Sequence, residues 1–299
     1  MSRPRILITG GQGQVGFELV RSFGLIGEVL APSRAELDLA DASAVKTWLA
    51  EHRPNWILNP AAFTAVDKAE SERELCWQVN AELPQLLAEY GVANNAGLIH
   101  FSSDYVYPGD GDRPRAEDAP TAPVNYYGKS KLAGDEAVLR ICAETTVPHY
   151  ILRTSWVYSA RGHNFLRTML RLGRERSHLN VVADQVGAPT SARCLAQLAV
   201  LMFTRRPESG LYHAVSRGEV SWQGFAQAIF RHAHALGYIL PIEPEQVAGI
   251  ATRDYPTPAQ RPLNSRLAVA KIEQALAVQL PQWETELQQV LMEWHSTQL

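Results

Sequence analysis

The sequence predicts an α/β protein: a doubly wound parallel sheet with a smaller C-terminal α/β lobe. From residue 5 to about residue 155, short aliphatic or β-branched runs alternate with amphipathic stretches of helical period. That alternation is typical of a parallel sheet covered by helices on both faces. After residue 160 the pattern loosens and prolines and turn signals become more frequent. We therefore divide the chain into a sheet domain, residues 1–155, and a second lobe, residues 156–299, some segments of which should return to the first domain.

The individual elements follow from run length and period. Short apolar runs predict strands at residues 5–9, 28–31, 56–58, 97–102 and 149–153. Longer amphipathic stretches predict helices at residues 17–23, 42–52, 75–91, 126–142, 165–174, 193–203, 222–236, 267–275 and 283–294. The proline-rich stretch 255–262 is too short for an interdomain linker, so we expect an ordered loop.

Composition and charge exclude several classes of protein. The net charge is −3, with acids and bases intermixed, so there is no basic stripe for a nucleic-acid partner. The three cysteines, Cys76, Cys142 and Cys194, form no CxxC pair and indicate a reducing compartment. The apolar run near the N-terminus is too short for a signal peptide, and no run reaches the roughly 18 residues needed to cross a membrane. We expect a soluble cytoplasmic protein.

A glycine-rich turn follows the first predicted strand. The segment Gly10-Gly11-Gln12-Gly13-Gln14-Val15-Gly16 leads directly into a predicted helix. Glycines there permit a tight turn and let backbone N–H groups approach a pyrophosphate at the helix N-terminus. The Lys-Ser/Thr of a nucleoside triphosphatase loop is missing. The placement predicts a Rossmann dinucleotide-binding domain; the alternative is a glycine-rich turn with no ligand.

The end of the second predicted strand bears on the choice of cofactor. An acid there would hold the ribose 2′-OH of NAD, whereas an arginine favours the 2′-phosphate of NADP. The segment reads Ala31-Pro32-Ser33-Arg34, so we expect NADP(H) first and NAD(H) second, with a solvated surface Arg34 as the alternative. Asp38 is a candidate for adenine contact, or else a cap for the helix that begins after Asp41.

The catalytic candidates are a tyrosine and a lysine four residues apart. Tyr127 and Lys131 share one face of the helix predicted at 126–142, so both can reach one ligand. A tyrosine pKa near 10 is lowered by a neighbouring ammonium, and Tyr127 would then protonate the alkoxide left when hydride reaches a carbonyl carbon. Lys131 could also hold the nicotinamide ribose. The alternative is a structural tyrosine beside a solvated lysine.

A serine completes this set. Ser103 lies where the predicted strand 97–102 ends, and the carboxyl ends of parallel strands are where ligands bind. Its hydroxyl can donate to a carbonyl oxygen and align it. The alternative is a serine that only satisfies the strand terminus.

With the glycine turn, Ser103, Tyr127 and Lys131 in this order, the chain resembles the extended short-chain dehydrogenase/reductase superfamily. Longer strings at 59–70, 102–109, 153–158, 184–190 and 261–267 resemble the dTDP-4-dehydrorhamnose reductases, over essentially the whole chain. The resemblance implies reduction of the C4 ketone of dTDP-4-dehydro-L-rhamnose to dTDP-L-rhamnose, which supplies rhamnose for bacterial surface polysaccharides.

The resemblance also implies roles for individual residues. Tyr127 would be the proton donor, Lys131 its electrostatic partner, and Ser103 the residue that tunes the tyrosine. Asp104 and Trp156 match substrate-contacting positions; a carboxylate can accept from sugar hydroxyls, and an indole offers a flat face. The positions that match cofactor contacts are Gly13, Gln14, Val15, Asp38, Leu39, Ala61, Ala62, Phe63 and Phe101.

One departure from the family concerns magnesium. Some members are dimers bridged by magnesium through glutamates, and Glu18 and Glu293 fit that pattern. The third position is Arg193, and a cation cannot ligate a cation. We therefore expect no such metal site. Whether the chain forms a homodimer is left open by the sequence.

Two other functions deserve comparison with a reductase. An epimerase or dehydratase of the same superfamily is disfavoured, because dehydratases need an acid pair and Asp104 is followed by Tyr105. A non-catalytic regulatory subunit that binds a dinucleotide, like the branch that serves S-adenosylmethionine synthesis, is disfavoured because Ser103, Tyr127 and Lys131 are all in place.

Overall fold

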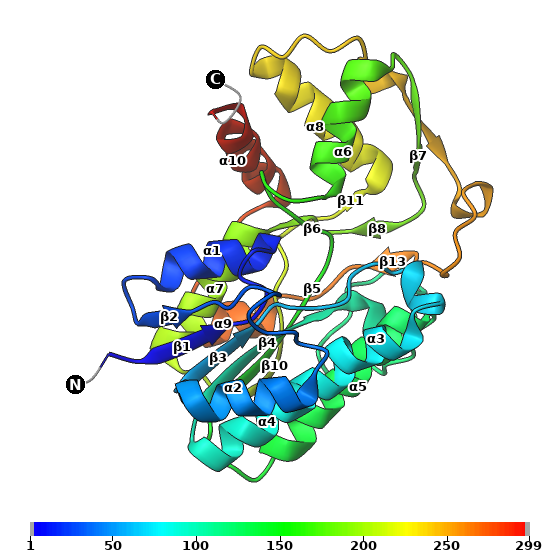
Figure 1. The fold of residues 1–299 in the computed structure, drawn as a ribbon. Helices are drawn as coiled ribbons and strands as arrows, with labels where there is room; N and C mark the ends of the chain where they lie inside the picture. The colour runs from blue at the N-terminus through cyan, green and yellow to red at the C-terminus, as the bar shows by residue number, and fades with distance from the viewer. Residues whose placement is uncertain (1–2, 297–299) are drawn as a thin grey trace.

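A six-stranded, entirely parallel sheet forms the centre of the computed structural model, which describes residues 3–296. The strand order is β10-β5-β4-β3-β1-β2 (Figure 1). The strands span β1 Arg5–Ile8, β2 Glu28–Leu30, β3 Trp56–Asn59, β4 Gly97–Ser103, β5 His149–Thr154 and β10 Gly210–His213. The order reverses at β1, between β2 and β3, which is the switch point where α/β sheets bind ligands. The predicted α/β class is confirmed.

Helices cover both faces of the sheet (Figure 1). On one face lie α1 Gln14–Phe23, α7 Ala192–Arg205 and α9 Ala270–Ala275, and on the other α2 Ala42–His52, α4 Leu83–Asn94 and α5 Tyr126–Cys142. Along β1, Ile6 and Ile8 enter the first core and Leu7 enters the second, as the period of a strand requires. Every residue of β3, β4 and β5 is buried, which explains their continuous apolar runs.

The predicted helix 75–91 is interrupted. The structure has α3 Arg73–Trp77, then one π-helical stretch, η2 Gln78–Glu82, and then α4. The wider turn places Asn80 against α5, where a Cβ on Gly134 would overlap the Asn80 carbonyl oxygen. A glycine therefore allows α5 to pack closely on this segment. The chain is helical throughout residues 75–91, as predicted; the π-helical turn within it was not predicted, because an i→i+5 turn leaves the apolar pattern almost unchanged.

The second lobe has its own core and short strands. Its helices are α6 Phe165–Glu175, α8 Trp222–Ala235 and α10 Trp283–Ser296, which pack around a common apolar cluster. Its paired strands are β7 Leu179–Val182 with β12 Val247–Ile250; β8 Val186–Gly187 with β11 Val220–Ser221 and β13 Asn264–Ser265; and β6 Val157–Tyr158 with β9 Thr190–Ser191. The 3₁₀ turns are η1 Lys68–Glu70, η3 Asp104–Val106, η4 Pro244–Gln246 and η5 Thr252–Asp254.

Parts of the C-terminal half lie in the first domain. Strand β10 pairs in parallel with β5, and α7 packs beside α1 on the sheet. The boundary near residue 155 stays a proposal, and β10 and α7 belong with the sheet. The predicted bounds of α2 and α5 are confirmed, and each of the five predicted strands overlaps an observed one. Among residues 3–296, no helix is long and apolar enough to span a membrane.

The central strand β3 allows a test of the core. Leu58 is fully buried in it, so Leu58→Ala should lower the free energy of unfolding by about 2–5 kcal/mol. Urea unfolding followed by circular dichroism measures this. Leu25→Ala is the control, because Leu25 is 96% exposed, and it should change stability by less than about 0.5 kcal/mol. Equal stabilities for the two variants would contradict the described core.

Candidate active site

One large cavity opens at the carboxyl ends of β1, β3 and β4, between the sheet and the second lobe. Its volume is about 810 Å³, within the range of pockets that hold cofactors and substrates. All the site residues predicted from the sequence line it: Gly10, Gly13, Gln14, Val15, Gly16, Arg34, Asp38, Leu39, Ala61, Ala62, Phe63, Phe101, Ser103, Asp104, Tyr127, Lys131 and Trp156. The fold thus brings residues from distant parts of the chain to one site.

The glycine turn has the backbone geometry that a pyrophosphate needs. Gly10 has φ +57°, a left-handed conformation that glycine adopts without strain, and its carbonyl accepts from the Gly13 amide at 2.9 Å. A Cβ on Gly16 would overlap the Gly10 carbonyl oxygen. Gly13 is the N-cap of α1 and has no side chain to bond the first N–H groups, and the first turn carries no acid. The free N–H groups at the start of α1 can therefore bind an anion such as a pyrophosphate.

The rim beside β2 carries Arg34 and Asp38, both exposed. The Glu36 carboxylate accepts from the Ser33 amide at 2.7 Å, and this contact lowers the pKa of Glu36. Asp38 accepts from the Ala40 amide at 3.1 Å within a local turn. Asp41, not Asp38, caps α2 through the amides of the next turn, so Asp38 has no role as that cap.

Helix α5 presents Tyr127 and Lys131 because its N-terminus is tightly fixed. The Asn125 side chain caps the helix by accepting from the Gly128 amide at 2.8 Å, and Glu70 accepts from the Tyr126 amide at 2.8 Å. A Cβ on Gly128 would overlap the Tyr105 carbonyl oxygen. The glycine therefore brings the start of α5 against the segment that follows β4.

Tyr127 is almost fully buried at the cavity. Its ring meets Tyr105 edge-on, with ring centroids 5.5 Å apart, and it packs in a cluster with Cys76. Burial raises the pKa of Tyr127, and a hydrogen bond from Ser103 acts in the opposite direction. Lys131 is not among the groups that lower the pKa of Tyr127, so the lowering expected from the sequence is not found and burial dominates. Within the chain, the phenol is held in its protonated form.

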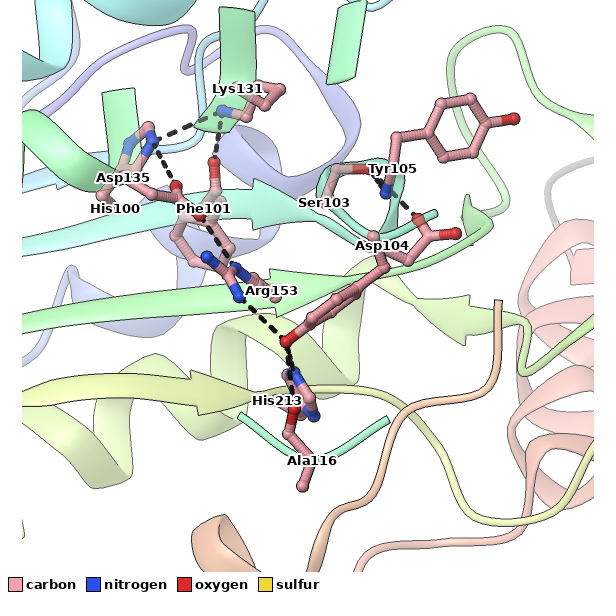
Figure 2. A network of polar contacts seen from close by, with 11 residues as sticks. His100, Phe101, Ser103, Asp104, Tyr105, Ala116, Lys131, Asp135, Arg153 and His213 are labelled. Carbon is pink, nitrogen blue, oxygen red and sulfur yellow. Dashed lines mark hydrogen bonds and ion pairs between the residues drawn. The ribbon is translucent and has the colours of Figure 1, made fainter. Parts of the chain in front are cut away.

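Ser103 and Asp104 lie together at the end of β4 (Figure 2). The Ser103 hydroxyl donates to Asp104 Oδ1 at 3.1 Å and accepts from the Tyr105 amide at 3.2 Å. Asp104 Oδ2 is buried and has no hydrogen-bond partner among residues 3–296. Burial raises the pKa of Asp104 to about 7. The Ser265 and Ser103 hydroxyls act in the opposite direction, and a ligand hydroxyl can supply a further donor to Oδ2.

The Lys131 side chain extends from α5 to the backbone of β4. Its Nζ donates to the Phe101 carbonyl at 2.7 Å and lies 3.4 Å from His100 Nε2 (Figure 2). Burial lowers the pKa of Lys131 to about 8, and Asp135 acts in the opposite direction. The lysine is therefore mostly cationic at neutral pH and loses its charge as the pH rises through about 8.

An aromatic stack forms the side of the cavity toward the second lobe. Trp156 has φ +50°, a strained conformation for a large side chain, and its ring stacks on Trp222 at 3.7 Å. The Trp222 Nε1–H donates to Gln185 at 3.2 Å. Trp222 also lines the cavity. It was not predicted as a site residue, because a tryptophan at the start of an amphipathic helix resembles an ordinary core residue.

Asn80 is a second residue that the sequence analysis missed. From the π-helical stretch its amide accepts from the Phe63 N–H at 2.8 Å and donates to the Phe63 carbonyl at 3.1 Å and to Ser130 at 3.0 Å. These bonds fix the chain that forms one side of the cavity relative to α5. A lone asparagine inside a helical pattern gave no signal of this contact.

The residues weighed as a magnesium site form ion pairs instead. Arg193 donates to Glu293 at 2.5 Å, and Arg21 lies 3.5 Å from Glu18 and 3.8 Å from Glu293. Over residues 3–296 the structure has no group of three or more histidine, cysteine or acidic side chains placed to hold a metal ion. Within this chain, the two arginines supply the positive charge beside Glu18 and Glu293.

Comparison with known proteins gives consistent matches. The model of the RmlD substrate binding domain family matches residues 4–296. The dTDP-4-dehydrorhamnose reductase of Escherichia coli (strain K12) is 41% identical over 98% of both chains, and that of Burkholderia thailandensis is 42% identical over 93% of this chain and 95% of the relative.

Solved structures agree. The dTDP-4-dehydrorhamnose reductase of Clostridium acetobutylicum has a TM-score of 0.89 at 33% identity, over 97% of this chain and 99% of that one. The enzyme of Bacillus anthracis, solved in complex with NADP, has a TM-score of 0.88 at 34% identity, over 98% and 100%.

The glycine turn provides a test of dinucleotide binding. Gly16→Ala should weaken binding of NADPH by at least about tenfold, about 1.4 kcal/mol, because the methyl group displaces the Gly10 carbonyl. Titration calorimetry measures the affinity. Gly24→Ala, at the other end of α1, is the control, because its Cβ would make only ordinary contacts. Unchanged affinity in Gly16→Ala, with the fold intact, would mean that the pyrophosphate binds elsewhere.

Proposed function

Because the chain belongs to the dTDP-4-dehydrorhamnose reductase family, we propose that it reduces the C4 ketone of dTDP-4-dehydro-L-rhamnose to dTDP-L-rhamnose with a nicotinamide dinucleotide. The observation that carries the proposal is that the glycine turn, Ser103, Tyr127 and Lys131 line one cavity. The buried, unbridged cysteines support the further proposal of a cytoplasmic location.

The residues present fit the dinucleotide. The turn around Gly13 and the N-terminus of α1 would hold the pyrophosphate, residues 61–63 the adjoining face of the cofactor, and Lys131 the nicotinamide ribose. When bound, the nicotinamide supplies the hydride that adds to C4 of the sugar. Arg34 follows β2 on the rim of the cavity, and no acid lies between the strand and Arg34 to favour a free 2′-OH, so we propose NADPH as the preferred reductant and NADH as the second.

The proton comes from the chain. As C4 gains hydride, the C4 oxygen takes the phenolic proton of Tyr127, and the ketone becomes a secondary alcohol. The phenolate left behind regains a proton from solvent. Ser103 would donate to the ketone oxygen and align it, while the Lys131 ammonium stabilises the phenolate. Lys131 thereby lowers the barrier without touching the substrate.

The sugar nucleotide would lie between the two lobes. The unpaired Oδ2 of Asp104 can accept from a sugar hydroxyl, and the stacked rings of Trp156 and Trp222 offer an apolar surface. Trp156 combines this stack with a left-handed backbone conformation, φ +50°. A rigid indole at the cavity would orient the ring so that C4 faces the nicotinamide.

The proton donor is tested by removing one hydroxyl. Tyr127→Phe should lower kcat by about 10²–10⁴-fold, because general acid catalysis contributes that much, while NADPH affinity stays the same. Stopped-flow absorbance at 340 nm with the 4-keto sugar nucleotide measures the rate. Tyr126→Phe, one residue away and outside the cavity, is the control and should keep wild-type turnover. Wild-type rates in Tyr127→Phe would remove Tyr127 from the mechanism.

Cofactor preference is tested at Arg34. Arg34→Ala should raise the KM for NADPH by at least about tenfold, since a hydrogen bond to a charged group contributes about 1.5–3 kcal/mol, and leave the KM for NADH nearly unchanged. Arg140→Ala removes an exposed arginine near the end of α5 and serves as the control. An equal change for both cofactors would show that Arg34 does not read the 2′-phosphate.

A further inference from the structure

Strand β5 ends with a buried hydroxyl, that of Thr154. The side chain lines the cavity of the active site, and the residue is 7% exposed. Its Oγ1 has no hydrogen-bond partner among residues 3–296. A buried hydroxyl that has lost water normally makes a hydrogen bond within the chain. At the wall of a cavity, such a hydroxyl is free to bond a ligand.

The period of the strand shows which side of the sheet Thr154 faces. Residues two apart on a strand point to the same side, and Leu152 packs with Leu195 of α7 in the first core. Thr154 therefore faces the side that α1 and α7 cover, and the glycine turn leads into α1 on that side (Figure 1). Tyr127 comes from α5, on the other face. The hydroxyl thus lies on the cofactor side of the cavity.

The neighbouring hydroxyls at the ends of β4 and β5 differ from that of Thr154. Ser103, which pairs with Thr154 in the register of the two strands, already makes two hydrogen bonds. Ser155 donates to a backbone carbonyl at 2.9 Å. Ser102 has no partner within residues 3–296, but it precedes Ser103 by one residue and therefore faces the α5 side. Of these four hydroxyls, that of Thr154 is unpartnered on the side of the glycine turn.

The strand order gives the direction of the bound dinucleotide. In the proposed binding mode the pyrophosphate lies at the glycine turn after β1, and Arg34 after β2 binds the adenosine end. Strand β2 is an edge of the sheet, and β3, β4 and β5 follow β1 in the opposite direction (Figure 1). Since the two nucleosides extend away from the pyrophosphate on opposite sides, the nicotinamide extends toward β4 and β5. Beyond the ribose at Lys131, the ring reaches the end of β5.

The chemistry of the nicotinamide ring matches this position. Its carboxamide has an acceptor oxygen and an NH₂ group with two donors, as in an asparagine side chain. A threonine hydroxyl can donate and accept, so it can bond either end of that group. Leu195 and Val157 line the same cavity and offer apolar surface to the ring. Because Lys131 is assigned to the ribose hydroxyls, the carboxamide is the polar group left for Thr154.

We propose that the Thr154 hydroxyl binds the carboxamide of the nicotinamide and fixes the rotation of that ring about its bond to the ribose. The proposal rests on the proposed function, because it takes the ligand of this cavity to be a nicotinamide dinucleotide. It adds a cofactor-binding residue for the half of the cofactor that reacts.

The direct test compares two ligands that differ in the nicotinamide. Thr154→Val removes the hydroxyl and nearly keeps the shape, so it should weaken NADPH binding by about three- to tenfold, the loss expected for one neutral hydrogen bond. Affinity for 2′-phospho-ADP-ribose, which lacks the nicotinamide, should stay within about twofold of wild type. Thr154→Ser keeps the hydroxyl and should bind NADPH within about twofold of wild type. Titration calorimetry measures all four affinities.

Stability without ligand gives a readout that a structural threonine would move. Removing a hydroxyl that has no partner breaks no bond in the chain, so Thr154→Val should unfold in urea at the same midpoint as wild type or a higher one. A lower midpoint with an equal loss of affinity for both ligands would make Thr154 a structural residue and overturn the proposal. If Thr154→Val does not fold, Thr154→Ala is titrated with the same two ligands, and equal losses for both again overturn it.

The matched control is another buried hydroxyl. Ser216 is 1% exposed, its Oγ has no hydrogen-bond partner in the described part of the chain, and it does not line the cavity. Ser216→Ala should leave the affinity for both ligands within about twofold of wild type. A loss of NADPH affinity as large as that in Thr154→Val would show that the effect is not specific to the cavity, against the proposal.

A change in the cofactor identifies the bonded group. The 3-acetylpyridine analogue of NADPH keeps the carbonyl and lacks the NH₂ group. The ratio of the two affinities should be at least about threefold larger in wild type than in Thr154→Val, because contacting groups are not additive. Equal ratios in the two proteins would mean that the hydroxyl does not accept from the carboxamide, and the proposed contact would then be wrong.

The outcomes separate this proposal from the function itself. Weaker binding of dTDP-L-rhamnose with unchanged NADPH affinity in Thr154→Val would place the hydroxyl at the sugar and overturn the proposal, even if Tyr127→Phe abolishes turnover. Wild-type protein that binds NADPH but does not turn over the sugar nucleotide overturns the proposed function, while the titrations still decide on Thr154.

Discussion

A buried cation is the constraint around which this active site is arranged. Lys131 is 1% exposed, and a charge so far from water is tolerated only with hydrogen-bond acceptors in place. Strand β4 supplies one through the carbonyl of Phe101, which accepts from Nζ at 2.7 Å. For Nζ to reach this carbonyl, the start of α5 must lie close to the end of β4, and Gly128, where a Cβ would overlap the Tyr105 carbonyl oxygen, allows that approach. The same approach brings Tyr127, one turn earlier, beside Ser103.

The second lobe is attached to the same helix. The Asn125 side chain that caps α5 also donates to the carbonyl of Gln260 at 2.8 Å, in the proline-rich loop. Beside it, Arg261 pairs with Asp67 at 2.8 Å. On the opposite side of the cavity, Gln14 of the glycine turn accepts from Asn164 at 2.8 Å. These contacts fix the second lobe relative to the start of α5 and to the glycine turn.

Much of this could be read from the sequence, for definable reasons. Strands buried on both faces leave unbroken apolar runs, and the bounds of α5 follow from its helical period. The spacing of Tyr127 and Lys131 gave their common face. Contacts across the sheet leave no such trace: His100 sits inside an apolar strand, Asn80 inside a helical pattern and Trp222 at an ordinary helix start. Their partners are distant in sequence, so only the packed structure reveals them.

The raised pKa of Tyr127 fits the direction of the reaction better than the lowered value expected from the sequence. A donor must hold its proton until the C4 oxygen develops negative charge, and a buried phenol does so at neutral pH. An alkoxide is a stronger base than a phenolate, so the transfer is still downhill. The ammonium of Lys131 is then needed after the proton has left, to stabilise the phenolate. The Asp135 carboxylate on the same helix is paired with Arg153 at 2.9 Å, so it compensates the Lys131 charge less and leaves that charge available to the phenolate.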